Sequence, residues 1–149
     1  MKTTYRHSWL GFLFAILMMP LAYGQGETIL VANFMNGNNA FLLSRIYLFN
    51  SSDTAGDITV RVFRLPPLSG VPEELTGAPF FLGVLEGKSA VNIKLAEDIL
   101  IPLLIPTPYL THAGNLTLEF TIASKNVRGA AQVFSGDFAF GTYPLQEIQ

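Results

Sequence analysis

The sequence predicts an all-β protein, a single antiparallel β-sandwich of about eight strands that is immunoglobulin-like or jelly-roll-like. Three observations predict it. Apolar and polar residues alternate over short runs, turn-forming residues separate these runs, and no long amphipathic helix pattern occurs. Alternation with a period of two places one face of a strand against a core and the other against water.

The strands are expected in two groups. The alternating segments are Ile58–Arg64, Val91–Leu95 and Leu116–Ile122. Other segments are apolar on both faces, which is typical of central strands or of strands covered on their second face. These are Thr28–Phe34, Phe41–Phe49 and Phe80–Leu85. Two further strands are expected, one directly after Asn126 and the other at Phe138–Tyr143.

Gly, Asn, Asp and Ser mark the connections, because these residues tolerate turn conformations. The turns are expected at Asn36–Asn39, Ser51–Gly56, Ser124–Asn126 and Ser135–Asp137, with a tight hairpin at Gly87-Lys88. Two connections are longer. Residues 66–79 are rich in Pro and Gly and are expected to form a surface loop, whereas 96–115 is long enough to suggest a function. In the latter, Ala96–Leu100 suits one helical turn, and an extended path is expected from Pro102 onward.

Residues 1–24 have the pattern of a cleavable signal peptide. Lys2 and Arg6 precede the apolar run 9–19, and Ala22 and Gly24 suit a cut after Gly24. The mature β-sandwich domain would then be 25–149, exported to the periplasm or the outside of a bacterial cell. No later segment is long and apolar enough to predict a membrane span.

Charge and cysteine content restrict the expected partners. Without Lys2 and Arg6, 7 of the 9 basic residues remain against 11 acidic ones, so the net charge becomes −4 instead of −2. A sparsely charged acidic chain argues against nucleic acid as a partner. The chain has no cysteine, which excludes disulfides, thiol catalysis and a lipid-anchoring cysteine.

We predict no catalytic residue, metal or cofactor, since each candidate has a simpler interpretation. His112 is the single histidine of the mature chain and has no nucleophile motif around it. Residues 53–57 and Asn50 offer oxygen atoms but lack the calcium-loop spacing. Glycosidases need two carboxylates across a sugar, which the adjacent pairs Glu73-Glu74 and Glu97-Asp98 do not establish. Asn50-Ser51-Ser52 and Asn115-Leu116-Thr117 match glycosylation acceptors.

The segment 99–106 contains aliphatic residues and proline and no polar residue. Such a segment either folds over an open end of the sandwich and completes the core, or forms an exposed patch for a partner. The residues of the possible interface are Ile101, Leu103, Leu104, Ile105 and Tyr109.

Three stretches, 31–52, 56–66 and 115–135, carry a resemblance. They share a strand, a Gly/Asn turn, a strand ending in Asn-Ser and a later strand pair around Asn126. The chain resembles uncharacterised exported bacterial β-sandwich proteins and, more distantly, sensory rhodopsin transducer-like domains. The resemblance implies a sandwich similar to carbohydrate-binding modules, and it brings no catalytic motif.

The sequence therefore predicts an exported, non-enzymatic domain that binds or assembles with a macromolecule, protein or glycan, and self-association is possible. One alternative is a carbohydrate-binding module using Tyr47, Tyr109 and Tyr143. Another is a hydrolase whose site is assembled by the fold around His112 or the carboxylates. A third possibility is strand exchange, in which Phe138–Gln149 adds to the sheet edge of a neighbour.

Overall fold

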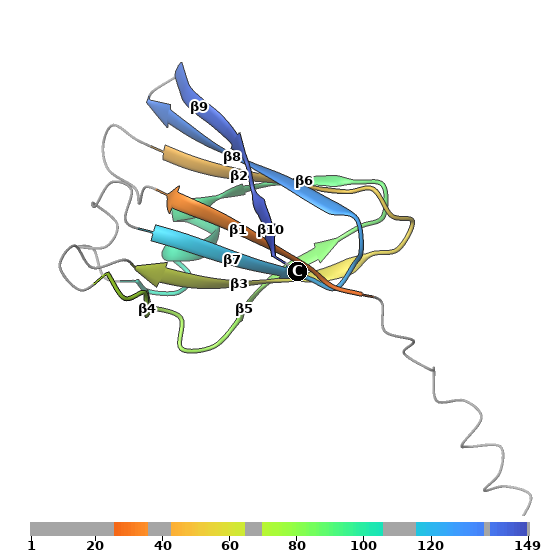
Figure 1. The fold of residues 1–149 in the computed structure, drawn as a ribbon, viewed down its shortest axis with the longest axis horizontal. Coiled ribbons are helices and arrows are strands. Elements are labelled where there is room, and N and C mark those ends of the chain that lie inside the picture. Colours follow the sequence, from red (N-terminus) through yellow and green to blue (C-terminus); the bar gives the residue numbers. More distant parts are fainter. Residues whose placement is uncertain (1–25, 36–42, 65–69, 106–115, 136–137, 149) are drawn as a thin grey trace, which may run out of the picture.

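The computed structural model describes residues 26–35, 43–64, 70–105, 116–135 and 138–148. They form ten strands and one short helix, arranged as two antiparallel sheets that pack into a β-sandwich (Figure 1). The predicted fold class, an all-β antiparallel sandwich, is confirmed. The predicted signal peptide lies outside the described residues.

The first sheet, sheet A, has the strand order β10-β1-β7-β3-β4, and β5 pairs with the same edge of β3 as β4 does. All of its pairs are antiparallel. Its strands are β1 (Thr28–Met35), β3 (Gly56–Arg64), β4 (Glu73–Glu74), β5 (Phe80–Leu85), β7 (Leu116–Ile122) and β10 (Gln146–Ile148).

The second sheet, sheet B, has the order β6-β2-β8-β9 and is also antiparallel throughout. Its strands are β2 (Leu43–Asn50), β6 (Ala90–Lys94), β8 (Val127–Ser135) and β9 (Phe138–Pro144). A π-helical turn, η1 (Leu95–Leu100), follows β6 directly and contacts β2 and β6.

The core lies between the sheets and is built from the alternating positions. In β7, for example, Leu116, Leu118, Phe120 and Ile122 are all buried, while the residues between them face outward. Burying a side chain of this size stabilises the fold by about 1.5–3 kcal/mol relative to exposing it. The fully buried side chains also include Met35, Ile46, Leu48, Val60, Leu85, Leu95, Ile99 and Leu100.

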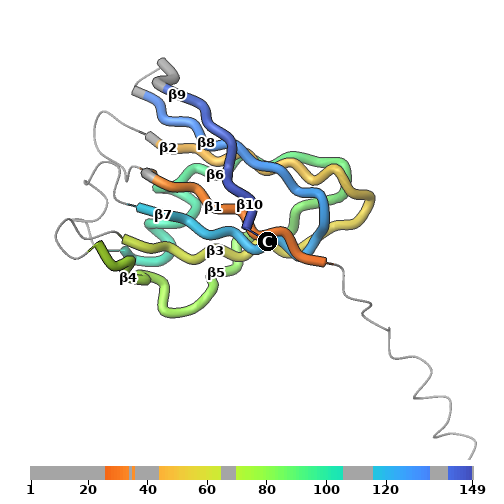
Figure 2. Tube along the Cα trace, in the orientation of Figure 1, coloured from red at the N-terminus to blue at the C-terminus, as the bar shows by residue number. Residues whose placement is uncertain are grey.

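The C-terminal segment joins both sheets of its own chain. In Figure 2 the chain leaves β9 in sheet B, crosses to the other layer and ends as β10 beside β1 in sheet A. Leu145 is the crossing residue: its side chain is buried, and its backbone N–H donates to the carbonyl oxygen of Gly129 at 2.9 Å. The segment proposed for strand exchange is therefore paired in cis in this structure.

All eight predicted strands are present, and three details differ from the expectation. The short strands β4 and β10 were not predicted, because two or three residues carry too little periodicity. The turn at Gly87-Lys88 is present, but the strands beside it, β5 and β6, pair in different sheets and form no hairpin. Residues 101–104 form a turn instead of an extended path.

Within the described ranges, no helix has the length and apolar character needed to cross a membrane.

Candidate functional site

The segment after β6 bends inward because its own carboxylates hold its start. Asp98 Oδ2 accepts a hydrogen bond from the backbone N–H of Lys94 at 2.7 Å, and Glu97 pairs with the Lys94 ammonium at 2.6 Å. Both acidic residues lie in the first turn of η1, where negative charge interacts favourably with unpaired N–H groups. These contacts start the helical turn that the sequence predicted at Ala96–Leu100.

The apolar side chains of this turn close one end of the sandwich. Leu95, Ile99, Leu100 and Ile105 are each at most 5% exposed and belong to the main core. Leu103 is partly buried and packs against that core. Within the predicted segment 99–106, Ile99, Leu100, Leu103 and Ile105 therefore help to complete the core.

A Schellman motif ends the turn. The N–H of Ile105 donates to the carbonyl oxygen of Leu100 at 3.1 Å. The N–H of Leu104 donates to the carbonyl oxygen of Ile101 at 3.0 Å. This pattern requires a left-handed conformation at the residue directly before Ile105, and Leu104 has it with a φ of 53°. Glycine is usual at such a position, since a side chain there costs free energy.

Two side chains of the same turn point away from the core. Leu104 is 86% exposed and Ile101 is 56% exposed, the former more than any other large apolar side chain among the described residues. We call Ile101 and Leu104 the apolar tip. Leu104 thus occupies an unfavourable backbone conformation without adding to the core.

The predicted interface residues differ in their exposure to solvent. Ile105 is buried and Leu103 is partly buried, whereas Ile101 and Leu104 are exposed. Tyr109 lies outside the described residues. The sequence carried one signal for this division: residues 100 and 105 are both apolar, as is usual at these two positions of a Schellman motif.

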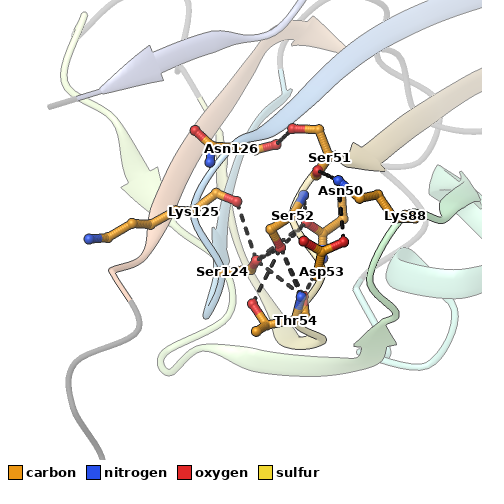
Figure 3. Close-up of polar contacts among 9 residues, drawn as sticks. All are labelled: Asn50, Ser51, Ser52, Asp53, Thr54, Lys88, Ser124, Lys125 and Asn126. Atoms are coloured by element: carbon orange, nitrogen blue, oxygen red, sulfur yellow. Dashed lines mark hydrogen bonds and ion pairs between the residues drawn. The ribbon is translucent and has the colours of Figure 1, made fainter.

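The opposite end of the sandwich is closed by hydrogen bonds around Asn50, the last residue of β2 (Figure 3). The Asn50 side chain is fully buried. Its Nδ2 donates to the carbonyl of Thr54 at 2.8 Å, and its Oδ1 accepts from the N–H of Ser52 at 3.0 Å. The hydroxyls of Ser52 and Ser124 lie 2.6 and 3.3 Å from the same Oδ1.

This polar cluster ties together segments from both sheets. Ser124, at the β7–β8 turn, is fully buried, and its carbonyl accepts a hydrogen bond from the Thr28 hydroxyl at 2.7 Å. The β5–β6 connection also approaches, because Lys88 N–H donates to the carbonyl of Ser52 at 2.9 Å. A side chain at Gly87 would meet the Asp53 carbonyl oxygen at 2.4 Å, so glycine permits this contact.

The cluster therefore has a structural role. Its buried donors and acceptors satisfy one another, as burial requires. As the Asn50 amide is buried and engaged, a glycosylation enzyme cannot reach it in the folded protein. Asp53 is held at 3.4 Å from the Lys88 ammonium, and the described residues contain no group of three His, Cys, Asp or Glu suited to a metal ion. The second acceptor triplet, 115–117, begins outside the described residues.

The carboxylate pairs considered for a hydrolase have neighbouring cations. Glu73 pairs with Arg64, and Glu74 lies 3.6 Å from Arg61. Glu97 and Asp98 line a groove of about 450 Å³ between β5 and β6, but both also contact Lys94. His112 lies outside the described residues. These contacts give the carboxylates a part in holding β3, β4 and η1.

The tyrosines proposed for sugar binding are in different surroundings. Tyr143 donates from its hydroxyl to the carbonyl of Asn33 at 3.0 Å, and burial raises the pKa of this hydroxyl above its ordinary value of 10.0. Tyr47 lies on β2 between the buried Ile46 and Leu48, so it faces outward from sheet B. Phe49, two residues later, shares that face and is 47% exposed. Sequence reasoning missed Phe49 because its segment is apolar on both faces.

Comparison with known proteins assigns no family and no activity to this chain. No family model matches the chain, and no curated protein matches it. A solved structure entitled "Crystal Structure of Thermotoga maritima 1070" is similar, with a TM-score of 0.46 and 11% sequence identity, over 83% of this chain and 95% of that one. A likeness of this degree carries no information about activity.

Proposed function

We propose that this chain is an exported, non-enzymatic domain that assembles with further copies of itself through the apolar tip. The observation that carries the proposal is Leu104, which is 86% exposed at a φ of 53°. A strained backbone position of this kind costs about 1–3 kcal/mol for a residue other than glycine. The core gains nothing from the Leu104 side chain, so a contact outside the chain accounts for it best.

The same molecule carries a surface of matching chemistry. A groove of about 390 Å³ lies on the outer face of sheet A, where Val31, Phe63, Pro72 and Ile148 supply apolar side chains. Polar and charged residues complete its lining: Asn33, Arg64, Thr117 and Glu119. Insertion of a leucine side chain there would remove its apolar surface from water. This removal is the main driving force for association.

A contact between the tip of one copy and the groove of the next is heterologous. Contacts of this kind form rings when the rotation closes and open chains when it does not. The signal peptide predicted at residues 1–24 supports a location of this assembly at the bacterial envelope or outside the cell. Because the tip and the groove are formed by different residues, a substitution can disable either half of the contact separately.

The test is light scattering after size exclusion on protein beginning at Gln25. Wild-type protein is expected to gain mass with concentration, while Leu104→Asn and Val31→Asn remain monomeric. Asparagine suits the left-handed position at 104, so the first variant keeps its fold. The control Val84→Asn changes another exposed apolar residue and is expected to assemble like wild type.

Mixing the two monomeric variants is the decisive measurement. Leu104→Asn retains a groove and Val31→Asn retains a tip, so the mixture is expected to form a dimer and nothing larger. Wild-type protein that stays monomeric at the highest concentration reached would overturn the proposal. So would a mixture that stays monomeric although both variants melt as wild type does.

A further inference from the structure

The outer face of sheet B forms a surface, here called the platform, that the proposed assembly does not use. Alternation in its strands turns three residues of β2 outward: Arg45, Tyr47 and Phe49. Their neighbours on the adjacent strands are given by the register. Lys94 and Gln132 flank Arg45, Asn92 and Ala130 flank Tyr47, and Ala90 and Arg128 flank Phe49.

Two aromatic rings stand along the centre of this platform. Tyr47 and Phe49 are two residues apart on one strand, which separates them by roughly 7 Å on the same face. Three of the four residues beside them are small or short, Ala90, Asn92 and Ala130, and the fourth is Arg128. Phe49 is 47% exposed, and Tyr47 is partly exposed.

The platform is also cationic in an acidic protein. Arg45, Lys94 and Arg128 lie on it, and the described outward positions of its strands carry no carboxylate. The ion pairs of the described residues involve Arg61, Arg64, Lys88 and Lys94. Arg45 and Arg128 take part in none of them, so their charges remain available to an anion.

Two contacts position the polar groups on the platform. The Arg45 guanidinium lies 4.9 Å from the centre of the Phe134 ring, a cation–π geometry that orients it without neutralising it. Gln132 Nε2 donates to the Thr142 hydroxyl at 2.8 Å, which holds the side-chain amide in place. Ordered groups lose less entropy when a ligand binds.

We propose that this face binds an acidic polysaccharide, with sugar rings stacked on Tyr47 and Phe49 and carboxylate or sulfate groups paired with Arg45 and Arg128. Arginine binds planar oxyanions with two parallel hydrogen bonds. Asn92 and Gln132 have the amide groups that suit sugar hydroxyls. Aromatic rings flanked by cations also suit single-stranded nucleic acid, and the predicted export signal favours the glycan.

The experiment uses affinity electrophoresis of the protein from Gln25 in gels that contain alginate, a polyuronate. Wild-type protein is expected to be retarded, and the retardation is expected to weaken with added salt because the ligand is charged. Phe49→Ala and the double variant Arg45→Ala/Arg128→Ala are each expected to bind about tenfold more weakly, a typical loss for a residue central to an interface.

Matched controls change residues of the same kind elsewhere. Phe81→Ala alters an exposed aromatic residue on β5, and Lys125→Ala alters an exposed cation in the β7–β8 turn; both are expected to bind as wild type. Leu104→Asn should also bind normally, which separates this site from the proposed assembly. Parallel gels contain heparin, a sulfated glycan, neutral dextran, or oligo(dT).

Four outcomes overturn the proposal, and a fifth, heparin binding alone, specifies it. Absence of retardation by both alginate and heparin shows that the face does not bind acidic glycans. Equal retardation by dextran shows that the arginine charges do not contribute to binding. Stronger binding of oligo(dT) shows that the face binds nucleic acid instead of a glycan. Equal losses in the controls show that the platform is not the site. Retardation by heparin alone keeps the site and identifies sulfate as its anion.

Discussion

The two ends of the sandwich are closed by different chemistry. At the polar end, Asn50 and Ser124 are fully buried and their hydrogen bonds are made within the protein. At the other end, η1 and the turn after it bury Leu95, Ile99, Leu100 and Ile105 and leave Ile101 and Leu104 exposed. The comparison separates stability from proposed function: polar groups that satisfy one another hold the fold, while the exposed Leu104 is the residue through which we propose that the chain assembles.

Asn50→Asp is expected to break the polar end with the largest effect. A carboxylate cannot donate to the Thr54 carbonyl, and it would bury an unpaired charge in place of the amide. Losses of about 3–5 kcal/mol are usual for such a buried charge. Because burial disfavours the charged form, the pKa of the new carboxyl would rise, and the loss should shrink as pH falls toward 4.

Urea denaturation between pH 4 and 8 measures this effect. Asn126→Asp is the matched control, because Asn126 is exposed and its φ of 62° is one that aspartate tolerates. Equal stability losses in the two variants would contradict the structural role of Asn50.

A second pair of variants compares neighbouring residues at the apolar end. Leu100→Ala removes a side chain that is fully buried and should destabilise the protein by about 3 kcal/mol, within the range known for core leucines. Ile101→Ala removes one that is 56% exposed and should change stability by less than about 1 kcal/mol. Thermal unfolding of both variants tests whether Leu100 faces the core and Ile101 faces away from it.

The smallest expected effect concerns Tyr143, which links β9 to β1 between the two ends. The folded-state pKa of its hydroxyl is raised by burial, so its contribution to stability is complete below about pH 10 and is lost at higher pH. Tyr143→Phe should cost about 1 kcal/mol through the hydrogen bond to Asn33 and should flatten the alkaline loss. Tyr47→Phe, on the outer face, is the control; identical alkaline profiles for wild type and Tyr143→Phe would contradict the prediction.

The fold was predictable because alternation is a local property of the chain. In Leu116–Ile122 each apolar residue that the pattern assigned to the core is buried. For the candidate site, the sequence predicted the segment but not which of its residues are exposed. Which aliphatic residues of 99–105 face the core depends on the Schellman turn, whose left-handed residue is a leucine where sequence reasoning looks for glycine.

The amino-acid sequence by itself determined the strands, most of the turns and the all-β class, since each follows from the period and propensity of a few adjacent residues. Tertiary structure decided how distant segments combine. It placed β5 and β6 in different sheets, brought Asn50 to Ser124, and set Arg45, Phe49 and Arg128 on one face. These are relations between residues up to 83 positions apart, the separation of Arg45 from Arg128, and they arise from packing two sheets around one core.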